Sequence, residues 1–221
     1  MKVILFGATG MVGQGVLREC LLDPRVTEVL AVGRTPLQRS DAKLTELIHS
    51  DLTNLESIED RLTGYDTCLF CLGTSSVGMD EPDYTRVTYD YAMSVGRTLA
   101  RLSPDSTFVY VSGAGTDSTE QGRSMWARVK GKTENDLLAL PFSAYMFRPG
   151  IIQPLHGVQS KTRLYRTAYT AATPLFFVLK RVAPNLVVTT DQIGAAMLAV
   201  AANGAAKRVL ESSDIRAASR Q

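Results

Sequence analysis

KVILFGATGMVGQG, residues 2–15, joins a short apolar run to three glycines and then to the start of a helical pattern. The run predicts a buried strand over 2–6, and the apolar residues after the glycines predict a helix that ends before Pro24. Gly7, Gly10 and Gly13 permit a sharp turn and a close approach of helix to strand. This order of elements is typical of the first unit of an α/β fold.

The same alternation of apolar strand and helical pattern continues to Arg148. Helical patterns cover residues 84–102 and 124–140. Strands that alternate with helices are usually parallel and buried on both faces. The sequence therefore predicts one domain over 1–221, with a doubly wound parallel sheet and helices on both of its faces. The further strand segments are 28–32, 44–49, 67–72, 107–112 and 143–148.

The alternation ends after Arg148. Residues 149–190 are rich in turn formers and then basic, which predicts a small C-terminal cap on the substrate side of the sheet. Its charges could meet an anionic substrate or simply keep a helix in water. A closing helix is expected with Thr190 or Asp191 as its N-cap and a stop at Gly204, and the polar tail after Glu211 is expected to fray. The basic residues of the cap are Lys161, Arg163, Arg166, Lys180 and Arg181.

The overall composition limits the partners that we expect. Apolar residues make up 45% of the 221 residues, and the formal charge is +2, which gives no general attraction to nucleic acid. Charges and a proline interrupt the apolar segment 164–183, so it predicts no membrane span, although surface contact stays open. The first residues do not resemble a signal peptide, so a cytoplasmic location is expected. We expect the protein to act on a small-molecule substrate and to be a monomer or a homodimer.

Cysteine and histidine predict no metal centre. Cys68 and Cys71 form a C-x-x-C pair, but residues three apart on a strand point to opposite faces. We therefore expect buried core thiols. His49 and His156 are too isolated for a metal site or a catalytic triad.

The glycine segment GATGMVGQG resembles the cofactor loop of extended and atypical short-chain dehydrogenases/reductases. Three more segments resemble this family: SDLTN (50–54) at the adenine, CLGTS (71–75) beside the nicotinamide, and RPG (148–150) after a strand. Over nearly the full chain the sequence resembles the NAD-dependent epimerase/dehydratase group, which implies a Rossmann-like fold that binds a nicotinamide dinucleotide. The cofactor contacts it implies are Gly7, Thr9, Gly10, Met11, Val12, Gly13, Asp51, Leu52, Leu72, Gly73, Thr74, Lys130, Pro149 and Gly150.

Arg34 favours NADP over NAD, with NAD as the alternative cofactor. It follows the second predicted strand, where an acidic residue would accept hydrogen bonds from the ribose of NAD. A guanidinium can instead pair with the 2′-phosphate of NADP and has no acceptor to offer. Asp51 has a second interpretation as the N-cap of a helix.

The resemblance assigns catalytic roles to Ser112 and Lys130. In the family a Ser polarises the carbonyl, a Tyr exchanges the proton, and a Lys lowers the Tyr pKa and holds the ribose. Here Trp126 stands four residues before Lys130, where that Tyr would be, and indole cannot exchange a proton near neutral pH. Three alternatives follow: Tyr84 takes over, water acts together with Lys130, or there is no turnover. Thr88 replaces the Asn of the family's Y-x-x-x-N segment, which weakens a Lys–water relay.

Two functions are therefore expected. The first is an NADP-dependent oxidoreductase or epimerase-like enzyme for a small carbonyl or alcohol substrate, with Ser112 polarising it and Lys130 holding the ribose. The second is a non-catalytic NADP-binding regulatory protein, favoured by Trp126.

Overall fold

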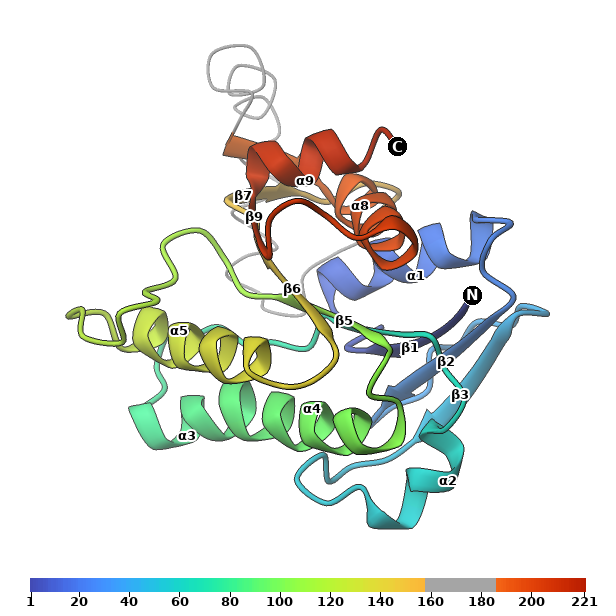
Figure 1. Cartoon of the computed structure of the whole chain (residues 1–221), viewed down its shortest axis with the longest axis horizontal. Helices are drawn as coiled ribbons and strands as arrows, with labels where there is room; N and C mark the ends of the chain where they lie inside the picture. Colours follow the sequence, from blue (N-terminus) through green and yellow to red (C-terminus); the bar gives the residue numbers. More distant parts are fainter. Residues whose placement is uncertain (158–185) are drawn as a thin grey trace.

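A seven-stranded parallel sheet forms the centre of the computed structural model, which describes residues 1–157 and 186–221 (Figure 1). The strand order is β3-β2-β1-β4-β5-β6-β9, so the order reverses direction between β1 and β4. Ligands of such sheets bind at that reversal, beyond the carboxyl ends of the strands. The strands are β1 (Lys2–Phe6), β2 (Glu28–Gly33), β3 (Leu44–Ile48), β4 (Thr67–Phe70), β5 (Thr107–Val111), β6 (Ser143–Arg148) and β9 (Val209–Glu211).

Helices cover both faces of the sheet, which confirms the doubly wound Rossmann-like fold. One layer contains α1 (Met11–Leu22), α8 (Thr190–Asn203) and α9 (Ser212–Ala218). The other contains α4 (Tyr91–Leu102) and α5 (Met125–Leu138), and Figure 1 shows it on the opposite side. The short elements of this second side are η1 (Glu56–Ile58), α2 (Glu59–Leu62), α3 (Glu81–Thr85) and the π-helical turn η2 (Arg86–Asp90).

The strands divide their side chains between two cores because successive residues of a strand face opposite sides. On β1, Val3 and Leu5 pack against α1 and α8, whereas Ile4 and Phe6 pack on the other side. All four are essentially inaccessible to solvent. Burial on both faces explains the nearly continuous apolar runs in the sequence.

The cysteines follow the same alternation. Cys68 belongs to the core beneath α4, while Cys71 packs on the opposite core with its sulfur 3.9 Å from that of Met197. Burial raises the pKa of both thiols, so they are unreactive core groups. The part of the chain that the structure describes contains no cluster of three or more metal-binding side chains.

The tail after Glu211 was predicted wrongly, because it forms the helix α9 instead of fraying, and the strand β9 just before it was not predicted. β9 pairs with β6, and α9 follows it with Ile215 fully buried. The short strand was missed because only Leu210 is buried in it. α8 begins one residue earlier than expected, since Thr189 is its N-cap and forms a reciprocal pair of hydrogen bonds with Gln192, and Gly204 ends it as predicted.

The predicted cap at 149–190 falls mostly outside the described residues. Its ends form a small two-stranded parallel sheet of β7 (Ile151–Gln153) and β8 (Val187–Thr189). The basic residues of the cap and the whole of the segment 164–183 lie in the undescribed range 158–185. Among the helices of the described ranges, none has the length and apolar character needed to cross a bilayer.

Candidate functional site

The glycine loop lies against the loop after β4, at the reversal of strand order. Gly7 has a φ of +82°, and a Cβ there would lie 2.5 Å from the backbone nitrogen of Leu72. Only glycine fits this contact without moving backbone. The loop residues Leu72, Gly73 and Thr74 therefore border the glycine loop directly, with Gly73 and Thr74 exposed.

The first turn of α1 offers free backbone donors. Gly10 is its N-cap, no side chain of the described residues caps it, and its first turn holds no acidic residue. A Cβ on Gly13 would come within 2.0 Å of the carbonyl oxygen of Gly7, so helix and loop touch there through backbone. An uncapped helix N-terminus behind a bare glycine turn fits a diphosphate group. Thr9, Met11 and Val12 are half-buried around it.

Arg34 and Asp51, which the sequence analysis predicted near the ribose phosphate and adenine of a cofactor, are exposed. Arg34 directly follows β2 with its side chain in solvent. Asp51 is not a helix N-cap, because the next helical turn, η1, begins at Glu56 with Leu55 as its N-cap. The Asp51 carboxylate instead accepts hydrogen bonds from the backbone and hydroxyl of Thr53, 3.0 and 2.6 Å away. These bonds, together with His49 and Arg86, hold the pKa of Asp51 below its usual value. The buried Leu52 lies beside it.

Ser112 and Lys130 lie together at the carboxyl end of β5. The Nζ of Lys130 donates to the backbone carbonyl of Ser112 at 2.9 Å and lies 5.7 Å from the ring centre of Tyr110. Burial lowers the pKa of Lys130 to about 8, although the negative charge of Glu134 acts against that shift. A lysine of this pKa is partly neutral near pH 8 and can exchange a proton there.

The hydroxyl of Ser112 is directed into the protein. Its Oγ donates to a carboxylate oxygen of Glu134 at 2.5 Å and lies 3.1 Å from the carbonyl oxygen of Phe147. A hydroxyl has one proton to donate. In this geometry Ser112 presents only acceptor capacity to a ligand.

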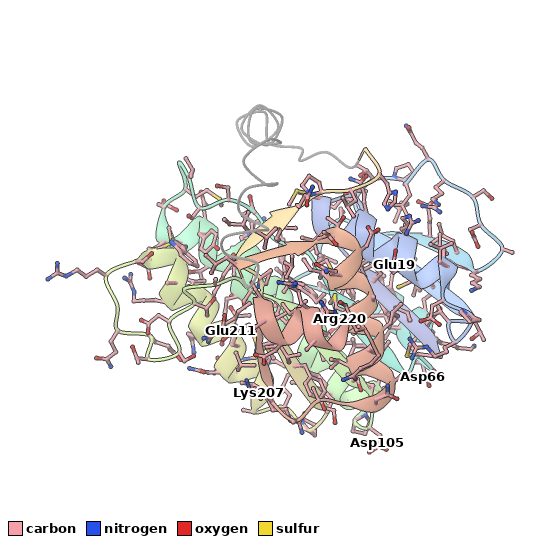
Figure 2. All side chains as sticks on the ribbon, turned by 90° about the horizontal axis from the view of Figure 1, so that it is seen from above. Glu19, Asp66, Asp105, Lys207, Glu211 and Arg220 are labelled. Carbon is pink, nitrogen blue, oxygen red and sulfur yellow. The ribbon has the colours of Figure 1, made fainter. Side chains whose placement is uncertain are left out.

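A buried ion pair lies behind Ser112. Glu134 is 1% exposed, and Arg148 at the end of β6 contacts both of its carboxylate oxygens, with Nε at 3.1 Å from each. Arg148 also donates to the Ser118 hydroxyl at 2.6 Å. The Nη1 of Arg148 lies 3.7 Å from the Oε1 of Glu211, which Figure 2 shows where β9 passes into α9. The Arg148 guanidinium thus links the end of β6 to α5 through Glu134, to the loop after β5 through Ser118, and to the end of β9 through Glu211.

Trp126, in the first turn of α5, packs against the loop after β5. A Cβ on Gly115, in the loop after β5, would lie 3.4 Å from its ring atom Cη2. Trp126 is half-buried, and one edge of its indole packs on Gly115, which is itself exposed. The replacement of Tyr by Trp therefore leaves an apolar wall beside the loop that carries Ser112.

Tyr84 lies inside the protein, with 1% of its surface exposed. It is in α3, directly before the π-helical turn η2, and acts electrostatically on the buried Tyr110. Thr88 in η2 is also buried, and its hydroxyl has no hydrogen-bond partner among the described residues. A proton passing through Tyr84 would have to cross this buried region.

The RPG turn packs against the C-terminal elements. Gly150 donates its backbone N–H to the hydroxyl of Ser212 at 2.8 Å, and a Cβ on it would lie 2.9 Å from the carbonyl oxygen of Leu186. Pro149 is buried beside it, and its carbonyl accepts from Ala114. The loops after β5 and β6 are therefore connected by backbone contact.

The sequence analysis missed Glu134 and Arg148. The available signal was a Glu four residues after Lys130, one helical turn away on the same face. Arg148 ends a strand, and nothing local in the sequence shows that it meets Glu134.

A family model described as NAD(P)H-binding matches residues 7–138, which is more than half of the chain. Protein fmp52, mitochondrial, from Emericella nidulans is 30% identical over 159 residues, covering 68% of this chain and 66% of that protein. Protein HTATIP2 from Rattus norvegicus is 25% identical over 155 residues, covering 68% and 62%. The chain thus spans a little under two thirds of the length of these relatives.

Solved structures with low sequence identity share the fold. The Bordetella bronchiseptica enzyme WbmF, in complex with NAD⁺, has a TM-score of 0.69 and 14% identity, with 98% of this chain and 76% of that one covered. DesIV, a dTDP-glucose 4,6-dehydratase from Streptomyces venezuelae with bound NAD, has a TM-score of 0.70 and 17% identity, with 95% and 74% covered. An oxidoreductase of the short-chain dehydrogenase/reductase family from Burkholderia thailandensis has a TM-score of 0.68 and 15% identity, with 97% and 92% covered. The chain therefore belongs to the NAD(P)H-binding family and has the Rossmann fold of short-chain dehydrogenases/reductases.

Proposed function

We propose that this protein is an NADP(H)-dependent oxidoreductase for a small carbonyl or alcohol substrate, in which Lys130 and not a Tyr exchanges the proton. The observation that carries the cofactor site is the bare first turn of α1, where Cβ atoms on Gly7 and Gly13 would collide with backbone. Arg34, exposed beyond β2, supports NADP over NAD. The basic residues proposed to attract an anionic substrate lie outside the described residues.

The proton chemistry depends on Lys130. A bound nicotinamide would supply or accept the hydride. Lys130, whose pKa is lowered to about 8, would donate the proton in reduction and accept it in oxidation. Trp126 would exclude water beside Gly115 without exchanging a proton.

A second candidate function is NADP(H) binding without turnover, as in a regulatory protein. The observation that favours it is the Ser112 hydroxyl, which donates to Glu134 and so is not free to polarise a substrate carbonyl. Cofactor binding would then order the loops around Gly73 and Gly115 and alter a surface for a partner.

NADPH titration followed by turnover assays separates the two functions. We expect NADPH binding by fluorescence and slow reduction in a panel of small aldehydes and ketones, with kcat falling above about pH 8 as Lys130 loses its proton. Trp126→Tyr should increase turnover by at least tenfold, because it restores a phenol beside Lys130. Binding without turnover in both proteins would favour the regulatory function, and no binding of either nicotinamide cofactor would exclude both.

A further inference from the structure

Two ionisable side chains of α5 meet on one residue. Lys130 and Glu134 lie one helical turn apart, and both contact Ser112 at the end of β5. The ammonium binds the Ser112 carbonyl at 2.9 Å, and the carboxylate accepts from the Ser112 hydroxyl at 2.5 Å. Ser112 therefore sets the position of both charges.

The carboxylate of Glu134 is buried but is not isolated. Arg148, itself largely buried, contacts both carboxylate oxygens, so the carboxylate is paired as well as hydrogen-bonded. A buried carboxylate stays ionised only with such partners. The charge lies next to the Lys130 site, not in solvent.

We infer that Glu134 is a positioning residue of the cofactor site, which anchors Ser112 and keeps Lys130 protonated so that the ammonium can hold a cofactor ribose. The ribose contact is the role that the family resemblance implies for Lys130, and it rests on the proposed cofactor site. The effect on the charge of Lys130 does not, because it follows from residues of this chain alone.

The groups around Lys130 determine the direction in which Glu134 shifts the Lys130 pKa. Tyr110 from β5 faces the ammonium, Tyr84 from α3 lies near Tyr110, and Arg148 from β6 acts from behind Glu134. Both tyrosines are buried, and burial raises the pKa of Tyr110, so its phenol carries no charge near pH 7. Glu134 is therefore the negative charge that offsets the burial of Lys130. Its loss should make Lys130 titrate at lower pH.

NMR titration of labelled lysine side chains in the cofactor-free chain measures this directly. The Lys130 resonance is assigned by its loss in Lys130→Arg. In Glu134→Gln we expect the Lys130 midpoint to fall by at least about one pH unit, and Glu134→Asp, which keeps the charge, should restore most of it. An unchanged midpoint in Glu134→Gln would overturn the inference.

Two further variants separate this effect from misfolding. Glu81→Gln removes an equal charge from an exposed ion pair in which Glu81 of α3 lies 2.7 Å from Arg128 of α5, the helix that carries Lys130. This variant should leave the Lys130 midpoint unchanged. If Glu134→Gln does not fold because Arg148 is left unpaired, the double variant with Glu134→Gln and Arg148→Met is measured instead, since it removes both charges of the pair. The double variant should show a smaller fall of the same sign, and no fall would contradict the inference.

The affinity for NADPH gives a second readout. As the pH rises from 6 to 8, the dissociation constant in Glu134→Gln should increase several-fold more than in the wild-type chain, because Lys130 becomes neutral earlier. If wild-type protein binds no NADPH, the proposed function fails, while the NMR titration still decides the role of Glu134.

Discussion

The absence of a side chain at each of two residues lets the glycine loop contact both α1 and the loop after β4 through backbone. A Cβ on Gly13 would lie 2.0 Å from the Gly7 carbonyl oxygen, and a Cβ on Gly7 would meet the backbone of Leu72. Backbone atoms cannot move aside as a flexible side chain can. The close contact of loop and helix leaves the N–H groups of α1 facing outward, toward the edge where ligands of such sheets bind.

At the residue scale, Arg34 should decide between the two cofactors. In Arg34→Ala we expect the NADPH dissociation constant to rise roughly tenfold or more, since a charge-assisted hydrogen bond contributes about 1.5–3 kcal/mol. The NADH constant should change less than about twofold, because NADH has no 2′-phosphate. Isothermal titration calorimetry with both cofactors measures the difference.

Arg39→Ala is the matched control, because Arg39 is also exposed in the loop after β2. It should leave both affinities within about twofold of wild type. Equal losses of NADPH and NADH affinity in Arg34→Ala would contradict the assignment of Arg34 as the selector.

At the element scale, α1 packs on α8 through glycines. A Cβ on Gly15 of α1 would lie 2.5 Å from the Cβ of Thr190, and a Cβ on Gly194 of α8 would lie 2.8 Å from the side chain of Glu19. Small residues on both helices let the two axes approach closely, so this packing depends on side chains that are absent.

Gly15→Ala should therefore destabilise the protein although alanine is the better helix former. The gain in propensity is about 1 kcal/mol, whereas overpacking against Thr190 costs roughly 1–3 kcal/mol. We expect the melting temperature to fall by about 2–6 °C. Gly33→Ala, where an added Cβ meets no atom within 4 Å, should leave it unchanged or higher, and a rise in Gly15→Ala would show that α1 can move away from α8.

At the scale of the whole molecule, paired carboxylates connect elements that are far apart in sequence. Asp136 of α5 accepts a hydrogen bond from the Tyr89 hydroxyl of η2 at 2.5 Å and pairs with Lys132 at 2.9 Å. Burial alone would raise the pKa of Asp136, but these hydrogen bonds outweigh it and lower the pKa. Hydrogen bonds from neighbouring groups likewise lower the pKa of Asp23, Glu28, Asp51, Asp117 and Asp214.

These shifts predict loss of stability in acid. A carboxyl with a folded-state pKa below its unfolded value stabilises the protein above the unfolded pKa, and this stability is lost as the pH falls through the folded pKa. Urea unfolding midpoints should therefore be constant near pH 6 and decrease below about pH 4. In Asp136→Asn the decrease between pH 5 and pH 3 should be smaller than in wild type, and an equal decrease would exclude Asp136 as a contributor.

The order of strands and helices and the glycine loop could be predicted from local sequence. Strand burial follows from runs of apolar residues, and the need for glycine follows from backbone geometry at Gly7, so neither requires knowledge of distant residues. The resemblance to the NAD(P)-binding proteins rested on the same local segments and is confirmed by the family match. The roles of Ser112, Lys130 and Arg34 stay predictions.

The sequence by itself determined a doubly wound sheet with a bare helix N-terminus at its carboxyl edge, because periodicity and glycine sterics act over a few residues. Only the tertiary structure decided which way the Ser112 hydroxyl points. Its acceptor Glu134 is 22 residues away, and Arg148, which pairs with that acceptor, is 14 further on. A hydrogen bond between a strand end and a helix depends on how the sheet is assembled, and no local pattern records it. Tertiary structure likewise decided that α9 forms, because this short helix is stabilised by burial of Ile215 in the core beside α8.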